Sequence, residues 1–323
     1  KKKRTMKLGG VMDTYYAEEM QEPLKPCMLM LEAGKTYDIK VEYSSPKGIT
    51  GMKLDWAPPS AGDAAAFADE MKALKDSDAV IAYVGLSLDL ERETRDRHDL
   101  DIPNDQNEYV KQALALNPNT AVVLINGGPV SINWINDNVP GILEAWYPGE
   151  QGGNAIADVL FGDYNPAGRV PVTYYKSVDD LPPFDDYEVS KGRTYMYFQK
   201  PVLYPFGYGL SYTTFDYSGL SLDKKTAGGK DVVNVTFNVK NTGSRGGDEV
   251  VQVYVGEINP PVKRPIKQLR GFKRVSIAAG ETKSVTIPVA IKDMMFWNDK
   301  AKKFEIEPGK YEIQVGASSA DIK

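Results

Sequence analysis

The chain has 323 residues, of which 42% are hydrophobic and 26% charged, the proportions of an ordinary globular protein with two or three domains. The formal net charge of −5 argues against nucleic acid or an anionic membrane as a partner, and no apolar run is long enough to span a bilayer. One cysteine, Cys27, and one histidine, His98, exclude an internal disulfide and disfavour a zinc site built from protein ligands alone.

Residues 1–58 predict β structure without a complete fold. Residues 36–43 alternate apolar and polar side chains, which is the period of a half-buried strand. Residues 28–31 and 52–56 predict shorter strands, and the basic residues 1–4 are better explained as the edge of a strand than as a targeting signal. Three or four strands of this length would be marginal alone. We therefore expect this segment to be the end of a larger β-domain.

Residues 59–200 predict the major part of an α/β domain. Expected helices alternate with apolar strands: helices at 64–75, 108–116 and 154–161, and strands at 79–85, 120–126 and 141–147. Strands and helices that alternate at this spacing predict a mostly parallel sheet, covered by helices and joined by right-handed crossovers.

The remainder, 201–323, predicts the end of a connector and then a β-sandwich. The connector begins near residue 176 and is rich in proline and aromatic residues, which we expect to pack inside. From residue 216 the period is two, and turn residues precede each of the predicted strands. These strands lie at 232–241, 249–256, 283–289 and 310–316. This spacing, without a helical pattern, predicts a sandwich of about one hundred residues.

The charged run LSLDLERETRDR, at residues 86–97, follows the first apolar strand of the α/β domain directly. Open α/β sheets place their ligand sites just beyond the carboxyl ends of their strands. A carboxyl group in this run could have its pKa set by the charged groups around it. The alternative is a solvated loop with surface ion pairs, and the run by itself favours this second interpretation.

Other chemistries find less support in the sequence. The glycine-rich segments at 127–129 and 149–153 do not match the dinucleotide fingerprint or the P-loop. We expect them to form tight turns between strands and helices. No Gly-x-Ser-x-Gly elbow accompanies His98, which argues against a serine–histidine hydrolase.

Three segments resemble glycoside hydrolase family 3. The first, EAWYPGEQGGNAIADVLFGDYNPAGRVPVT at 144–173, is similar to the α/β sandwich domain of that family. The second is GRTYMYF at 192–198, followed by YPFGYGLSYTTF at 204–215. The third is the predicted sandwich, with NTG at 241–243, LRGF at 269–272 and PGKY at 308–311, which resembles the family's fibronectin type III-like domain. Residues 1–58 resemble the last part of the protective-antigen-like β-domain that some members carry as an insertion.

The resemblance implies a retaining, exo-acting β-glucosidase or β-xylosidase. Such enzymes need two carboxyl groups about 5–5.5 Å apart, one as nucleophile and one as acid and then base. In this family the nucleophile is an aspartate on an N-terminal (β/α)8 barrel, and the acid/base is a glutamate on a loop of the α/β domain. Matching DRHDLDIP at 96–103 with the family segment places the acid/base at Glu93, with Glu91 as the fallback. Arg92 and Arg97 are the candidate substrate-binding residues.

The family's nucleophile segment has no counterpart in the 323 residues. We therefore expect the chain to be the C-terminal portion of a larger enzyme, inactive alone, with no metal and no cofactor. The expected partners are an oligosaccharide or aryl β-glycoside substrate and the barrel portion of the same enzyme. A second copy of the enzyme is a further candidate partner, in a homodimer. Periplasmic or extracellular localisation is favoured over cytoplasmic. The alternative function is a non-catalytic carbohydrate-binding or scaffolding module on the same fold.

Overall fold

The computed structural model describes residues 2–8, 11–17, 39–40, 64–88, 90–94, 96–103 and 106–323, with side chains from residue 70 onward. The chain divides into two compact units, Lys1–Ala68 and Asp69–Lys323. The predicted domain boundaries at 58 and 200 stay predictions.

The first unit contains a three-stranded antiparallel sheet in the order β2-β1-β3. Its strands are β1 (Lys2–Leu8), β2 (Val11–Ala17) and the short β3 (Ile39–Lys40). Of the predicted strand at 36–43, only residues 39–40 are described. The predicted strands at 28–31 and 52–56 lie outside the described residues. The basic residues 2–4, which the sequence predicted at the edge of a strand, form part of β1, and this strand lies between β2 and β3.

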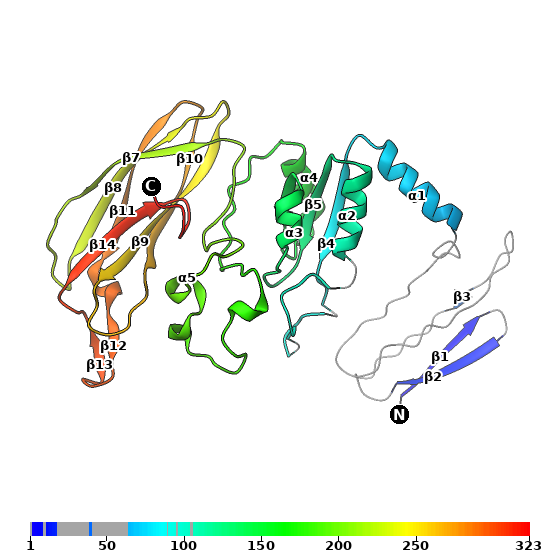
Figure 1. The fold of residues 1–323 in the computed structure, drawn as a ribbon, viewed down its shortest axis with the longest axis horizontal. Coiled ribbons are helices and arrows are strands. Elements are labelled where there is room, and N and C mark those ends of the chain that lie inside the picture. Colours follow the sequence, from blue (N-terminus) through cyan, green and yellow to red (C-terminus); the bar gives the residue numbers. More distant parts are fainter. Residues whose placement is uncertain are drawn as a thin grey trace. The chain divides into compact units, whose positions relative to one another are not determined.

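Alternating helices and strands follow along the chain, beginning with a helix that starts at the end of the first unit and continues into the second (Figure 1). In chain order these are α1 (Ala64–Asp76), β4 (Val80–Gly85), α2 (Gln106–Leu116), β5 (Thr120–Ile125), α3 (Asn133–Asn138), β6 (Gly141–Glu144) and α4 (Gly152–Leu160). Strands β4, β5 and β6 lie side by side and parallel. Helices α2 and α3 are neighbours, since the Lys111 ammonium lies 5.3 Å from the centre of the Trp134 ring. The core between sheet and helices includes Val110, Leu124 and Ile135, which are at most 1% exposed.

This arrangement confirms the predicted parallel sheet and corrects two details. The third strand was expected over 141–147 but ends at Glu144, because Trp146 adopts a left-handed backbone with φ of 55° and a residue in that region cannot continue a strand. Helix α3 was not predicted. It spans only six residues and has no side-chain cap at Ile132, so neither periodicity nor a capping residue marks it.

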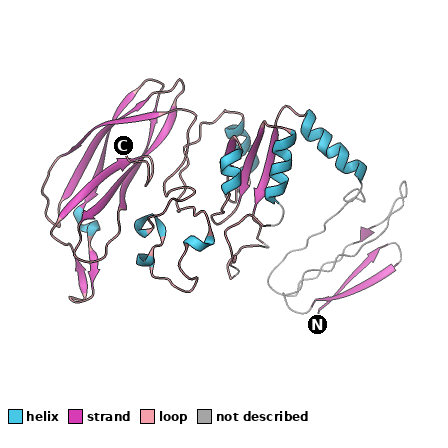
Figure 2. Ribbon diagram, in the orientation of Figure 1, coloured by secondary structure: helices cyan, strands magenta, loops and turns pink. Residues whose placement is uncertain are grey.

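A loop-rich connector separates this sheet from the next (Figure 2). Its regular elements are three short helical turns: η2 (Val178–Asp180), η3 (Val189–Lys191) and α5 (Thr194–Tyr197). Some of its aromatic rings pack internally, as expected, whereas Phe184, Tyr187 and Tyr212 are 71%, 81% and 46% exposed. Tyr195 stacks on Phe206 with 4.3 Å between ring centres, and Tyr174 meets Tyr204 edge to face at 5.6 Å.

The C-terminal part is a β-sandwich, as predicted. Its elements are β7 (Phe215–Leu222), β8 (Val232–Asn241), β9 (Gly247–Ile258), β10 (Gln268–Ile277), β11 (Thr282–Ala290), η4 (Ile291–Met294), β12 (Phe296–Asn298), β13 (Lys303–Glu305) and β14 (Lys310–Gly316). Antiparallel sheets ordered β11-β8-β7 and β10-β9-β14 face each other. Their inner positions, such as Phe237, Val253 and Ile287, are at most 3% exposed. The alternation that buries every second residue of β8 is the pattern by which the sequence indicated this strand.

Strands β7 and β10 escaped prediction because their patterns are irregular. Each contains a register shift against its neighbour, between Ser218 and Ser221 in β7 and between Leu269 and Gly271 in β10. A bulge of this kind moves the following side chains to the opposite face and interrupts the period of two.

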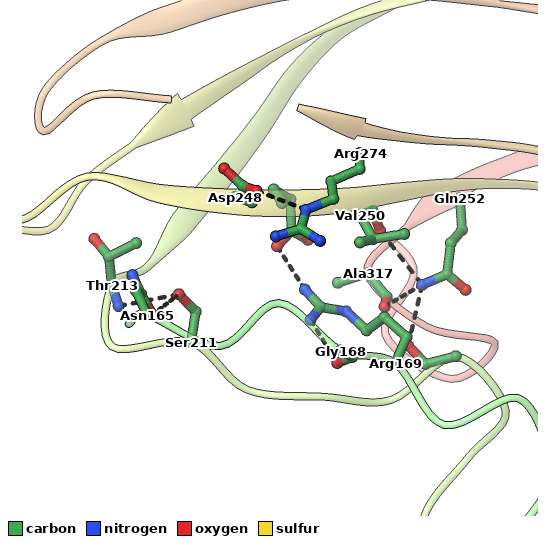
Figure 3. A network of polar contacts seen from close by, with 12 residues as sticks. Asn165, Gly168, Arg169, Ser211, Thr213, Asp248, Val250, Gln252, Arg274 and Ala317 are labelled. Atoms are coloured by element: carbon green, nitrogen blue, oxygen red, sulfur yellow. Dashed lines mark hydrogen bonds and ion pairs between the residues drawn. The ribbon is translucent and has the colours of Figure 1, made fainter. Parts of the chain in front are cut away.

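A buried ion pair joins the segment between α4 and the connector to the sandwich. The Arg169 guanidinium lies 2.7 Å from a carboxylate oxygen of Glu249 on β9, and the two side chains are 9% and 3% exposed. The Tyr217 hydroxyl donates to the other Glu249 oxygen at 2.7 Å. A second link is the Gln252 amide, which donates to the carbonyl oxygens of Gly207 and Ala317 (Figure 3). These contacts attach the sandwich firmly to the segment that follows α4.

Candidate functional site

The loop that follows β4 carries the charged run, and Glu91 is its best-anchored carboxylate. One Glu91 oxygen accepts hydrogen bonds from the backbone N–H groups of Gly127 at 2.8 Å and Gly128 at 2.9 Å, and from the Tyr147 hydroxyl at 3.3 Å. The other oxygen pairs with the Arg97 Nε at 3.0 Å. The two glycines follow β5 and Tyr147 follows β6, so Glu91 links the carboxyl ends of three neighbouring strands.

Arg97 completes this anchor. Its Nη2 donates to the Pro129 carbonyl oxygen at 2.7 Å, and its side chain, like that of Glu91, is 15% exposed. Its Nη1 is buried with no hydrogen-bond partner in the described part of the chain. Arg97, a predicted substrate-binding residue, is therefore occupied mainly in holding the loop.

Glu93 differs sharply from Glu91, although only one residue separates them. Its side chain is exposed and takes part in none of the hydrogen bonds or ion pairs found among the described residues. The next residue, Thr94, has a left-handed backbone with φ of 70°, which is costly for a β-branched side chain and is found most often where function constrains the chain. Arg92 is also exposed, and its guanidinium donates a long hydrogen bond to the Leu88 carbonyl oxygen at 3.4 Å.

The glycine-rich segment after β5 has a role that the sequence analysis missed. It forms a tight turn, as expected, and its consecutive N–H groups bind the Glu91 carboxylate. A methyl group on Gly127 would lie 2.9 Å from Glu91 and 2.6 Å from the Tyr147 ring, so any larger residue would push these groups apart. The one available signal was the pair of glycines directly after a buried strand, a place where backbone N–H groups often bind an anion.

Glu144, at the end of β6, is a carboxyl group that was not predicted as a site residue from the sequence. Glu144 accepts hydrogen bonds from the Tyr174 hydroxyl at 2.7 Å, the Trp146 N–H at 3.1 Å and the Asn126 amide at 3.4 Å. All three donors are neutral. Burial raises the pKa of Glu144 above its ordinary value, and these hydrogen bonds offset that rise only in part. The Tyr174 hydroxyl, itself buried, also has its pKa raised, chiefly by burial.

Replacing Glu144 with glutamine is expected to change how stability depends on pH. The folded protein holds the Glu144 proton more tightly than the unfolded chain does, because the folded-state pKa is raised above 4.5. This tighter binding of the proton contributes to the free energy of unfolding. The contribution is complete below the unfolded-state pKa and is lost as the pH rises through the folded-state pKa. Between about pH 4 and pH 8, wild type should therefore lose more free energy of unfolding than Glu144→Gln. Urea denaturation at a series of pH values measures this, and parallel curves for the two proteins would contradict it.

The described residues contain no cluster of three or more side chains suited to hold a metal ion. Within the same ranges, no helix is both long and apolar enough to cross a membrane. The three carboxyl groups described above differ in their surroundings: Glu91 is fixed by hydrogen bonds, Glu144 is buried, and Glu93 is exposed.

Two family models match the chain. The glycosyl hydrolase family 3 C-terminal domain matches residues 2–212, and the fibronectin type III-like domain matches residues 249–319. The xylan 1,4-beta-xylosidase of Xylanibacter ruminicola is 37% identical over 305 residues, which cover 91% of this chain and 34% of that protein. The periplasmic beta-glucosidase of Salmonella typhimurium is 38% identical over 285 residues, 84% of this chain and 36% of that protein. The chain thus spans about a third of the length of these relatives.

Solved structures match over the same portion. The family 3 beta-glucosidase of Bifidobacterium adolescentis is similar with a TM-score of 0.75 and 36% identity, over 84% of this chain and 41% of that one. The beta-glucosidase of Kluyveromyces marxianus in complex with glucose gives a TM-score of 0.73 and 36% identity, over 80% of this chain and 32% of that one.

Proposed function

Because the chain belongs to glycoside hydrolase family 3, we propose that it is the C-terminal portion of a retaining, exo-acting β-glycosidase and supplies its general acid/base, Glu93. The substrate is a β-glucoside or β-xyloside cleaved from the non-reducing end. The aspartate nucleophile comes from an N-terminal barrel elsewhere in the enzyme, and the chain alone is inactive.

The observation that carries the choice of Glu93 is the contrast between the two glutamates of the loop. An acid/base must reach the glycosidic oxygen and exchange its proton with water, so it has to be accessible. The Glu91 carboxylate already accepts four hydrogen bonds, which engage both of its oxygens in holding the loop. Glu93 is exposed on the same loop. In the first step it donates a proton to the departing oxygen, and in the second it removes one from the attacking water.

The family assignment also explains why a free carboxyl group is useful here. A retaining glycosidase needs a second carboxyl group about 5–5.5 Å from its acid/base. Glu93 meets that partner only when the nucleophile is in place. The pair of carboxyl groups is therefore completed by the assembled enzyme rather than by this chain.

A comparison of this chain with the full-length enzyme tests the proposal. The full-length enzyme should hydrolyse 4-nitrophenyl β-glucoside or β-xyloside and release the sugar first as its β-anomer, detectable by proton NMR. The chain alone should release no nitrophenol. Turnover by the chain alone, or first release of the α-anomer, would contradict the proposal. Sugar binding without turnover by the full-length protein would favour a non-catalytic carbohydrate-binding module.

A further inference from the structure

The segment after β6 carries a second set of contacts that converge on the loop of Glu93. Trp146 has a left-handed backbone with φ of 55°, which is unfavourable for a bulky residue and persists only where its surroundings hold it. The Glu144 carboxylate accepts a hydrogen bond from the Trp146 N–H at 3.1 Å. The Trp146 ring packs edge to face on the Tyr174 ring, with 6.3 Å between ring centres. The strained turn is thus fixed from both sides.

Glu144 also connects this turn to the turn that follows β5. The Asn126 amide donates to Glu144 at 3.4 Å and to the Gly128 carbonyl oxygen at 3.0 Å. Asn126 is fully buried. The residue pair Gly127 and Gly128, which binds Glu91, is therefore aligned by the same carboxylate that fixes Trp146.

The turn at Trp146 places Tyr147 against Glu91. The Tyr147 ring packs over Gly127, and its hydroxyl donates to Glu91 at 3.3 Å. Tyr147 is 40% exposed, so part of its ring lies at the surface. Its pKa is raised by burial and by the Glu91 charge, which keeps the hydroxyl protonated as a donor.

We infer that Tyr147 is a positioning residue for the acid/base: its hydroxyl holds Glu91 at the Gly127–Gly128 turn and thereby fixes where Glu93 stands. The inference rests on the proposed function. Tyr147 does not itself transfer the proton. It restricts the loop to the position in which Glu93 can protonate the leaving group, and orientation of this kind contributes to rate.

The test is Tyr147→Phe in the full-length enzyme, with substrates that differ in their need for acid assistance. Cleavage of an alkyl β-glycoside depends on protonation of a poor leaving group, whereas a 2,4-dinitrophenyl β-glycoside departs without it. We expect kcat/KM to fall about tenfold for the alkyl glycoside and less than about threefold for the dinitrophenyl glycoside, since one hydrogen bond to a charged group is lost. Gly127→Ala, which displaces the Tyr147 ring but keeps its hydroxyl, should give the same pattern.

Tyr164→Phe is the matched control. Tyr164 is also about half exposed, at 46%, and its hydroxyl also contacts a charged side chain, Arg274 on β10. This variant should leave both rates unchanged. Equal losses on both substrates in Tyr147→Phe, or no loss on either, would overturn the inference. The proposed function is assessed separately by Glu93→Ala: if that variant shows the selective loss and Tyr147→Phe does not, only the role of Tyr147 is wrong.

Discussion

In the full-length enzyme, Glu93→Ala is expected to lower turnover of alkyl β-glycosides by about 10²–10⁴-fold, the usual contribution of a general acid. A 2,4-dinitrophenyl β-glycoside should still form the covalent intermediate, because its leaving group needs no proton. Hydrolysis of that intermediate should then limit the rate, since no base activates water. Added azide should restore turnover and give a β-glycosyl azide, because this anion attacks without a base.

Glu91→Ala is the matched control for that experiment. It should reduce the stability of the protein by about 1–3 kcal/mol, because it leaves the largely buried Arg97 and two backbone N–H groups without their acceptor. Any loss of turnover should fail to respond to azide. Azide rescue in Glu91→Ala, with none in Glu93→Ala, would mean that the acid/base lies two residues earlier than proposed.

Arg169→Ala is expected to destabilise the second unit by about 3–5 kcal/mol, the range for removing one partner of a buried ion pair. Glu249, at 3% exposed, would lose its cationic partner and retain the Tyr217 hydroxyl as its donor among the described residues. The loss should appear in urea denaturation of the chain as a lower midpoint. The contact links the sandwich to the rest of the unit, because Arg169 lies in the segment that follows α4 and Glu249 lies on β9.

Two variants check the cause of that loss. Arg169→Met combined with Glu249→Leu should recover most of the stability, since apolar residues of similar volume often replace a buried pair without cost. Lys191→Ala, which removes an exposed ion pair with Asp186, should have no measurable effect. If Arg169→Ala behaves like Lys191→Ala, the buried pair contributes specificity of docking rather than stability.

Much of the architecture was predictable because it depends on neighbours in the chain. The period of two in β8 and the apolar runs of β4 and β5 indicated these strands, and the alternation with α2 and α4 indicated a parallel sheet. Elements were missed where the local signal is weak: α3 is short and uncapped, and β7 and β10 contain register shifts. The predicted end of β6 was wrong because Trp146 leaves the extended region. Its N–H binds the Glu144 carboxylate, which also accepts a hydrogen bond from the Tyr174 hydroxyl.

The amino-acid sequence alone determined which loop carries the candidate chemistry and which family the chain resembles, because both depend on residue types at fixed spacing. The resemblance placed the acid/base at Glu93 with Glu91 as the fallback, but the residue types alone do not show how the two side chains differ in their surroundings. Only the tertiary structure shows that Glu91 is anchored and Glu93 exposed, because the groups that bind Glu91 come from Gly127, 36 residues away, and Tyr147, 56 residues away. Hydrogen bonds across such separations exist only after β4, β5 and β6 have paired, so the accessible glutamate is a product of the folded sheet.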